Sequence, residues 1–263
     1  VAYGAFAEAY RVIYVADATR RARSALDSRR TARVVPHGLP PEEEAALLAR
    51  WDRTSARARL GIEDDEIAVV LVGTLCANKA QRDLVEAVGL MPGDLRHRIR
   101  VFLVGATGED CYAEAIAEAV AALPPEAAPR VTLTGEVDDP FLYQAAADIA
   151  VCASASESAP RALVEAMVAG LPIVTTPVFG IAEMVIENVN ALFFAPGDVA
   201  ALAEQITRLD DDEALRARLA AQSRVVLASR PGYREMIASF TAMVREAVNL
   251  DMTPNEPAAR SDA

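Results

Sequence analysis

Short apolar segments alternate with helical segments along most of this chain, and this alternation constrains the fold more than any other feature. Six segments have the composition of buried strands: 66–73, 100–105, 130–135, 149–154, 172–176 and 190–196. Stretches with helical periodicity, many of them about a dozen residues long, separate most of these segments. Parallel strands joined in this way form right-handed crossovers. The sequence therefore predicts an α/β fold, a doubly wound Rossmann-like parallel sheet flanked by helices.

Further elements lie on both sides of this alternation. Two β-branched runs, 11–17 and 33–40, come before it, and the second contains Pro36, Gly38 and Pro40. The segment 40–61 has the pattern of one polar helix between a proline start and a glycine end. Three helical segments follow the last strand. The tail 251–263 has little to bury, so we expect it to be disordered.

The composition excludes several classes of function. Hydrophobic residues make up 52% of the chain but aromatic residues only 5%, which favours an Ala/Val/Leu core between helices and a parallel sheet. A net charge of −12 repels a phosphate backbone, so we expect no nucleic-acid partner. The run 20–30 is basic but is interpreted as a solvated helix and turn.

The cysteine and histidine pattern indicates no metal site and no disulfide frame. The three cysteines are far apart and odd in number, and His37 and His97 are isolated. We therefore expect no metal cofactor and a reducing, cytoplasmic setting. No apolar run is long enough to cross a membrane and no signal peptide opens the sequence; contact with the inner face of a membrane as a peripheral protein is left open.

A ligand site in such a sheet is expected beyond the carboxyl ends of its strands, at helix N-termini. The segment after the fourth strand, "SASESAPRALVEAM", is the most informative. Pro160 suits a first helical turn and Ser158 could cap the helix. The free N–H groups of the next two residues, Arg161 and Ala162, would then face a phosphate.

Two glutamates flank this helix start. Glu165 lies off the apolar stripe among alanines, where its carboxylate could accept two hydrogen bonds from a ribose diol. Glu157 lies just before the helix and could contact a sugar joined to the phosphates. The alternative is that Glu157 interacts with the helix dipole and Glu165 is an ordinary solvated residue.

The segment "ESAPRALVEAMVAGLPIVTTP" resembles the donor-binding signature of the retaining GT-B glycosyltransferases of family 4. Its core is Glu, seven residues, Glu, then Ala-Met-x-x-Gly-x-Pro-[VI]-Val. The similarity continues in order through "VVPHGL", "GTLCANKAQRDLVEAV", "VFLVGA", "VTLTGEVDD", "YQAAADIAVCASASES" and "PGDVAALAEQI", so it covers about residues 11–245. The resemblance implies a nucleotide-sugar donor and an unknown acceptor, which could be a saccharide, a lipid or a small molecule.

The resemblance also implies roles for single residues. Glu165 would hold the ribose hydroxyls, and Glu157 would contact hydroxyls of the donor sugar. Lys79 would neutralise the leaving phosphate, and the backbone at Arg161 and Ala162 would bind the diphosphate. The remaining donor-binding positions would be Gly73, Thr74, Ser158, Ala159, Pro160 and, facing the base, Val137. Lys79 and Glu157 are thus the predicted catalytic residues; Glu157 is not assigned as a nucleophile.

This sequence departs from the family at three of these positions and at one residue beside them. Thr74 stands where many members have arginine, and Ala80 stands where the lysine is usually followed by glycine. Ala159 replaces an aromatic residue, and Pro160 replaces a glycine N–H donor. The side chain of Arg161 could compensate for the missing arginine or face solvent. These differences leave the donor base and the sugar open.

The implied domain organisation places only part of a two-domain GT-B enzyme in this chain. Residues 1–35 would be the end of the N-terminal acceptor domain, 36–228 the donor-binding domain, 229–250 a crossover helix and 251–263 the tail. We expect a fragment that binds nucleotide but transfers sugar poorly without the missing N-terminal domain. The apolar face of the crossover helix would be exposed and could pair two copies as a homodimer.

Two other classes of function stay open at this point. One is an epimerase or phosphorylase that acts on nucleotide sugars or related substrates with the same architecture. The other is a non-catalytic nucleotide-binding or partner-binding module, which Thr74 and Ala159 favour. A dinucleotide oxidoreductase is disfavoured because no Gly-x-Gly-x-x-Gly loop follows a strand.

Overall fold

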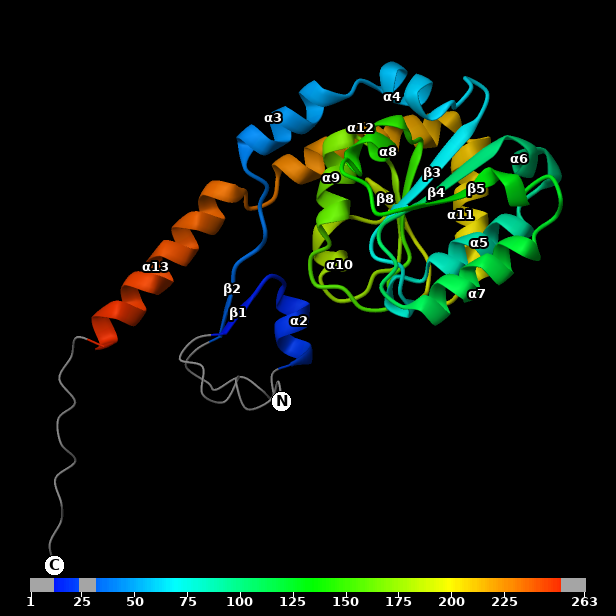
Figure 1. The fold of residues 1–263 in the computed structure, drawn as a ribbon. Coiled ribbons are helices and arrows are strands. Elements are labelled where there is room, and N and C mark those ends of the chain that lie inside the picture. The colour runs from blue at the N-terminus through cyan, green and yellow to red at the C-terminus, as the bar shows by residue number, and fades with distance from the viewer. Residues whose placement is uncertain (1–11, 24–31, 252–263) are drawn as a thin grey trace, which may run out of the picture.

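A six-stranded parallel sheet forms the centre of the molecule (Figure 1). The structure is a computed structural model that describes residues 12–23 and 32–251. The strand order is β5-β4-β3-β6-β7-β8. These strands are β3 (Ile67–Val72), β4 (Ile99–Val104), β5 (Val131–Gly135), β6 (Ile149–Cys152), β7 (Ile173–Thr175) and β8 (Ala191–Phe193). The predicted α/β fold with a doubly wound parallel sheet is confirmed.

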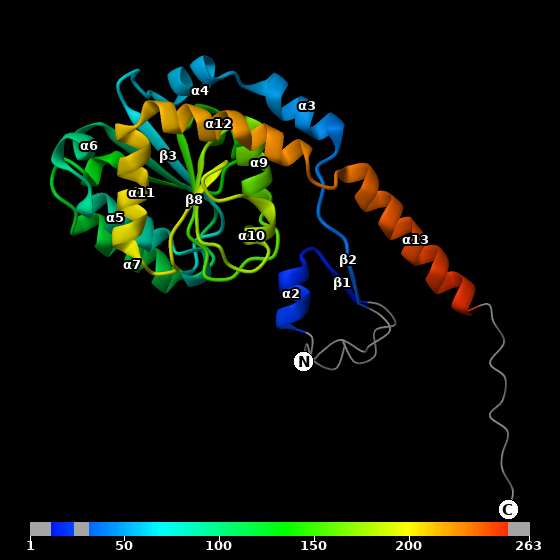
Figure 2. The same ribbon diagram turned by 180° about the vertical axis from the view of Figure 1, so that it is seen from behind.

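Helices cover both faces of this sheet (Figures 1 and 2). One core contains side chains of α5 (Gln81–Leu90), α7 (Asp110–Ala121) and α11 (Val199–Asp211). The other contains side chains of α4 (Arg53–Leu60), α8 (Phe141–Ala146), α9 (Arg161–Ala169) and α10 (Ile181–Met184). The long helix α12 (Glu213–Ala228) contributes to both. Burial on both faces explains why the central strands are continuous apolar runs, such as "IAVVLV" in β3.

The ends of the described chain lie outside the six-stranded sheet. Strands β1 (Val12–Tyr14) and β2 (Ala32–Val34) form a separate two-stranded parallel sheet beside α2 (Asp17–Ala22). A linker leads from β2 to α3 (Pro41–Arg50), and α13 (Tyr233–Asp251) extends away from the sheet (Figure 1). The predicted disordered tail lies outside the described residues except for Asp251, which ends α13. Part of the basic run 20–30 is also outside them.

The segment 40–61 is two helices instead of the single predicted one. Trp51 is extended at the end of α3, and the Asp52 side chain then accepts a hydrogen bond from Ser55 N at 2.9 Å to begin α4. An aspartate at the N-cap satisfies a free N–H group of the new helix, so the break occurs there. Three short elements were also not predicted: α6 (Gly93–Arg98) and the 3-10 turns η2 (Ala77–Lys79) and η3 (Ala128–Arg130).

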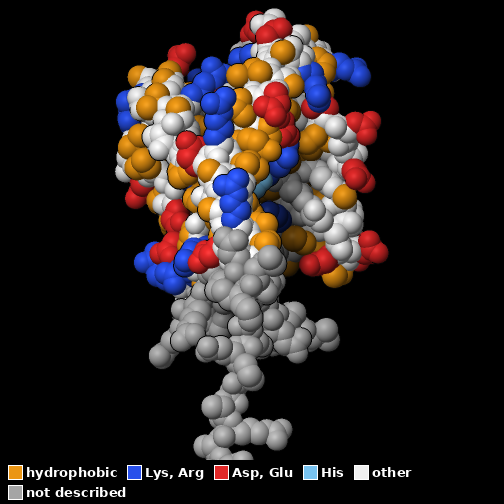
Figure 3. Space-filling model, turned by 90° about the vertical axis from the view of Figure 1, so that its left-hand side faces the viewer, with side chains coloured by type: hydrophobic (Ala, Val, Ile, Leu, Met, Phe, Trp, Pro, Cys, Tyr) orange, Lys and Arg blue, Asp and Glu red, His pale blue; other side chains and the backbone are white. Residues whose placement is uncertain are grey.

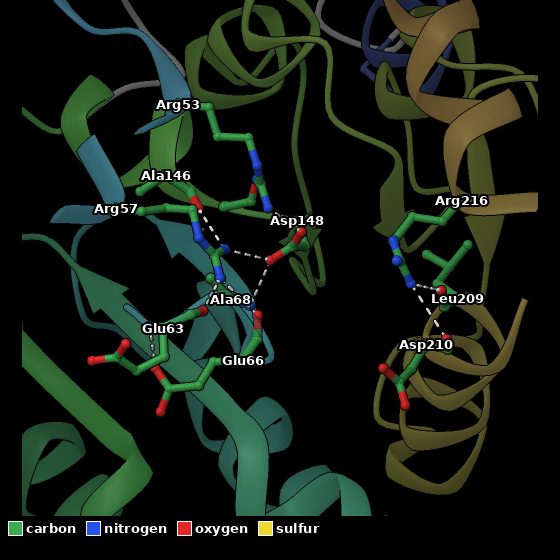
Figure 4. A network of polar contacts seen from close by, with 11 residues as sticks. Arg53, Arg57, Glu63, Glu66, Ala68, Ala146, Asp148, Leu209, Asp210 and Arg216 are labelled. Carbon is green, nitrogen blue, oxygen red and sulfur yellow. Dashed lines mark hydrogen bonds and ion pairs between the residues drawn. The ribbon is translucent and has the colours of Figure 1, made fainter. Parts of the chain in front are cut away.

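A buried arginine ties α4 to the sheet (Figure 4). Arg57 donates to Asp148 Oδ2 at 3.0 Å and to the carbonyl oxygen of Glu66 at 2.9 Å. Asp148 precedes β6 and also accepts from the backbone N–H of Ala68 in β3, at 2.9 Å. The side chains of Arg57 and Asp148 are only 8% and 10% exposed. This network lies at the amino end of the strands and therefore leaves the carboxyl end free for a ligand.

Candidate functional site

The strand order reverses between β3 and β6, and this reversal places the candidate site. From β3 the chain adds β4 and β5 on one side, whereas β6, β7 and β8 follow on the other side. The loops that leave β3 and β6 at their carboxyl ends must therefore diverge and leave a crevice between them, which is where open α/β sheets bind ligands. These loops, 73–80 and 153–160, carry most of the predicted site residues.

The two loops are joined by three contacts. Asn78 Nδ2 donates to the carbonyl oxygen of Ser156 at 2.9 Å, and Ala155 N donates to the carbonyl oxygen of Asn78 at 2.9 Å. Lys79 forms an ion pair with Glu157. The structure thus brings together the two residues that were predicted to be catalytic, although they are 78 positions apart. Both side chains are mostly buried, with 24% and 16% exposed.

The buried side chain of Gln81 fixes the backbone of the first of these loops. This role was not predicted from the sequence. The side chain is fully buried, and Nε2 donates to the carbonyl oxygens of Gly73 and Thr74 at 3.2 and 3.0 Å. The backbone of Gly73 also lies so close to Gly105 that a Cβ at Gly105 would collide with it. Thr74 itself is exposed. The position of Gln81 directly after Lys79-Ala80, at the start of a helix, was the available signal.

The N-terminus of α9 faces the same crevice. Helix α9 begins at Arg161, and Pro160 occupies the N-cap without a side-chain capping bond. The first N–H groups of a helix have no partner within it, so those of Arg161 and Ala162 are available to an anion. The carbonyl oxygen of Ala162 accepts from Gln144 Nε2 at 3.0 Å, which fixes this first turn against α8.

Ser158 does not cap α9, contrary to the prediction. Its hydroxyl accepts a hydrogen bond from Thr19 Oγ1 at 2.9 Å, because α2 packs against this loop. Nearby, Glu183 of α10 accepts from the N–H groups of Asp17 and Ala18 at the start of α2. The loop that carries Glu157 and Ser158 thus contacts the N-terminal part of the chain.

Gly180 fixes the other side of this loop. Its N–H donates to the carbonyl oxygen of Glu157 at 3.1 Å. A Cβ at position 180 would collide with the carbonyl oxygen of Ser158 and the Cβ of Ala16. Only glycine allows the start of α10 to approach the loop this closely.

Glu165 is buried, whereas it was predicted to lie on an accessible side of α9. It is 7% exposed, because α9 is covered by α8, α12 and α3 and not only by the sheet. Arg161 Nε donates to Glu165 Oε1 at 2.7 Å, and Arg161 Nη2 donates to Glu43 of α3. These bonds, that to Glu165 first, raise the pKa of Arg161. The guanidinium of Arg161 is therefore bound by two carboxylates, although its side chain stays about half exposed.

The last two predicted positions lie at the margins of the site. Ala159 is half-buried and packs against the core that includes α9. Val137 follows β5, and β4 separates β5 from β3. Val137 is thus at the same edge of the sheet as Lys79 but is two strands away from the loop of Lys79.

A partly buried thiol lies behind the crevice. Cys152 ends β6, and its sulfur lies 3.6 Å from the hydroxyl oxygen of Ser154. Burial raises the pKa of this thiol, so it stays protonated and unreactive near neutral pH. Within the described residues, no three histidine, cysteine or acidic side chains gather where they could hold a metal ion, and no helix there is long and apolar enough to cross a membrane.

The chemistry of the site follows from these positions. A lysine and the N-terminus of a helix provide positive charge for an anion, and the two together suit a diphosphate. Glu157 lies just before the first residue of α9, and Glu165 lies within the helix. Each carboxylate can accept hydrogen bonds from hydroxyl groups joined to that anion.

Residues 52–226 match the family described as "Glycosyl transferases group 1". The chain belongs to this family. All the predicted site residues, from Gly73 to Glu165, lie within the match.

Curated relatives of this chain include enzymes that glycosylate different acceptors. A D-inositol 3-phosphate glycosyltransferase of Geodermatophilus obscurus is 32% identical over 194 residues, 68% of this chain and 40% of that protein. The lipopolysaccharide glucosyltransferase WaaG of Escherichia coli is 27% identical over 192 residues, 73% of this chain and 50% of that protein. The chain therefore spans half or less of the length of these group 1 relatives.

Solved structures share the fold over a larger part of the chain. HepE of Anabaena, in complex with UDP and glucose, has a TM-score of 0.77 at 24% identity and covers 92% of this chain and 65% of its own. Sucrose-phosphate synthase of Thermosynechococcus elongatus has a TM-score of 0.78 at 23% identity, covering 95% and 61%. At these identities the likeness establishes the fold, that of GT-B glycosyltransferases.

Proposed function

We propose that this chain is the donor-binding half of a retaining glycosyltransferase, which transfers a hexose from a nucleoside-diphosphate sugar to an acceptor. The observation that carries the proposal is the ion pair of Lys79 and Glu157 beside the N-terminus of α9, at the point where the strand order reverses. Membership of the group 1 family and the UDP and glucose bound by the structurally similar HepE support it.

The proposed reaction breaks the bond between the anomeric carbon of the sugar and the phosphate oxygen. The electron pair leaves with the diphosphate, and positive charge develops on the sugar. Lys79 Nζ and the N–H groups of Arg161 and Ala162 would stabilise the departing anion, because fixed positive groups in a partly buried site need little reorganisation. To reach it, Lys79 would share its contacts between Glu157 and the phosphates.

Retention of configuration requires the acceptor hydroxyl to approach from the same face as the leaving diphosphate. Glu157 would hold hydroxyls of the hexose and orient the sugar for that attack. Glu165 would hold the ribose diol. Neither carboxylate is proposed as a nucleophile, and the proton of the acceptor hydroxyl would pass to a phosphate oxygen of the leaving group.

The domain organisation forms part of the proposal. Residues 36–228 would be the donor-binding domain, with 229–250 crossing toward an acceptor-binding domain of which 1–35 would be the end. Because the chain spans half or less of its curated relatives, we expect the 263 residues alone to bind nucleotide but to transfer sugar poorly. Rapid sugar transfer by this chain alone would contradict that expectation.

Calorimetric titration of the chain with UDP, GDP and ADP tests the donor site. We expect one of the three to bind, and Glu165→Ala to weaken it by about tenfold or more, equivalent to about 1.4 kcal/mol. Glu204→Ala on the exposed side of α11 is the control and should leave affinity unchanged. If none of the three nucleotides binds, the proposed donor site is wrong for this chain.

A further inference from the structure

Arg161 connects the proposed ribose-binding carboxylate to a helix that follows the linker. Its Nε atom donates to Glu165 Oε1 at 2.7 Å, and its Nη2 atom donates to Glu43 on α3. One guanidinium thus bridges two carboxylates, one from α9 itself and one from α3. The Glu165 side chain is 10% exposed, compared with 53% for Arg161 and 35% for Glu43.

The burial of Glu165 makes this arginine important. A buried carboxylate needs a partner to compensate for lost hydration, so without Arg161 the Glu165 side chain would be free to rotate toward solvent. The hydrogen bond from Arg161 Nε holds one oxygen of this carboxylate in place. No described residue donates a hydrogen bond to the other oxygen, Oε2, which leaves it for a ligand.

We propose that Arg161 is a positioning residue for nucleotide recognition: it holds Glu165 in the orientation that accepts the ribose hydroxyls, and Glu43 anchors its far end. The inference rests on the proposed function, because it assigns a role within the same donor site. It differs from a direct role in phosphate binding, in which the guanidinium would have to leave both carboxylates.

The chain contains a matched pair of residues for comparison. Arg82 and Glu86 on α5 have the same i, i+4 spacing, the same Nε–Oε1 distance of 2.7 Å and the same arginine exposure of about half. The difference is the glutamate, since Glu86 is 39% exposed and Glu165 only 10%. Ordinary loss of a surface ion pair is therefore measured by Arg82→Met, and loss of the positioning role by Arg161→Met.

The test is the ratio of affinities for nucleotides that differ by one group. UDP, 2′-deoxy-UDP and UMP, or the guanine or adenine equivalents if those bind, are titrated into the unaltered chain, Arg161→Met, Arg161→Lys and Arg82→Met. In the unaltered chain we expect UDP to bind about tenfold more tightly than 2′-deoxy-UDP. This ribose preference should fall to about twofold in Arg161→Met and be intermediate in Arg161→Lys, because lysine keeps the charge but not the planar fork.

The other ratios and controls separate the alternatives. The preference for UDP over UMP should be the same in Arg161→Met as in the unaltered chain, and Arg82→Met should change neither preference. Loss of the UDP-over-UMP preference with an intact ribose preference would overturn the inference in favour of a phosphate contact. An unchanged ribose preference in Arg161→Met would also overturn it. Failure of the unaltered chain to bind any nucleotide would instead refute the proposed function and the inference together.

Discussion

Ala80 adopts a backbone conformation that is costly for alanine. Its φ is 54° and it joins η2 to α5, directly after Lys79. A left-handed conformation costs a residue with a Cβ about 1–2 kcal/mol, and glycine does not incur this cost. The strain is located where the backbone must turn to direct Lys79 toward Glu157.

We therefore expect Ala80→Gly to stabilise the chain by about 1 kcal/mol, after allowance for the greater freedom of glycine in the unfolded state. Urea unfolding measures this effect as a rise in the midpoint at constant slope. Ala117→Gly, at an exposed position within α7, is the control and should destabilise by about the same amount. Loss of stability in both variants would show that position 80 is not strained.

The residue-level prediction from sequence was partial, and the reason is physical. Lys79 and Glu157 were each predicted as site residues, and the structure pairs them because their loops follow strands that a parallel sheet brings together. The partners Gln81 and Glu43 were not predicted. The contact of Glu43 depends on where α3 packs, which no local pattern encodes. The position of Gln81 beside Lys79 was a signal, but it does not specify which carbonyl groups the side chain contacts. The prediction that Glu165 is accessible was wrong for a similar reason. Helices α3 and α12 cover a side of α9 that the periodicity of α9 alone leaves open.

The start of α10 acts as an element that sets the shape of the Glu157 loop. Gly180 has an ordinary φ, so alanine would be acceptable to its own backbone, but a Cβ there would collide with the Ser158 carbonyl. Gly180→Ala must displace either α10 or the loop.

We expect this substitution to weaken binding of the selected nucleotide sugar by about tenfold or more, because Glu157 would move with its loop. Calorimetric titration with the nucleotide sugar and with the nucleotide alone measures the effect, and the larger loss should be for the sugar-containing ligand. Gly93→Ala, where the added Cβ meets only an arginine side chain at 3.7 Å, provides the control. Equal affinities in both variants would show that the loop accommodates the methyl group.

The attachment of α4 to the sheet depends on Asp148. We expect Asp148→Ala to destabilise the chain by about 3–5 kcal/mol, because it leaves the buried Arg57 without a carboxylate partner and Ala68 N–H without an acceptor. Chemical unfolding monitored by circular dichroism checks this value. The exposed Asp65 provides the comparison, and Asp65→Ala should change stability by less than about 0.5 kcal/mol.

Helices and strands were predicted well where hydrophobic periodicity marks them. They were predicted poorly where a single capping residue sets the boundary between two elements. All six central strands appear near their predicted positions because each is short and rich in apolar or β-branched residues. The break between α3 and α4 depends on one aspartate side chain, and α6 is too short for a periodic signal. Such boundaries are set by a few hydrogen bonds and not by burial.

At the scale of the whole molecule, α13 presents an apolar face that the described residues do not cover. Ile237, Phe240, Val244 and Val248 are exposed along one side of it, at 43%, 36%, 60% and 56%. Elsewhere the surface is mixed: Figure 3 shows basic and acidic side chains interspersed over the face that it views. The net charge of −12 makes two copies repel each other. Burial of the apolar stripe would favour their association and must exceed this repulsion.

We expect the chain to self-associate at high concentration and salt, because salt screens the repulsion and strengthens apolar burial. Sedimentation velocity of Phe240→Glu should show association weakened by about tenfold or more relative to the unaltered chain. Ser239→Glu adds the same charge on the opposite side of α13 and should have a smaller effect. A chain that stays monomeric under all these conditions would contradict the prediction.

The reversal of strand order between β3 and β6 also affects how the protein folds. Val69 pairs with Ile149, so the loops of the site meet only after a segment of about 80 residues has closed. Contacts of such long sequence separation form slowly. A ligand that bridges the two loops binds the native state and not the unfolded chain, and it therefore stabilises the fold by mass action. A bound donor would then connect the loops that follow β3 and β6. Its presence would slow the separation of these two strands during unfolding.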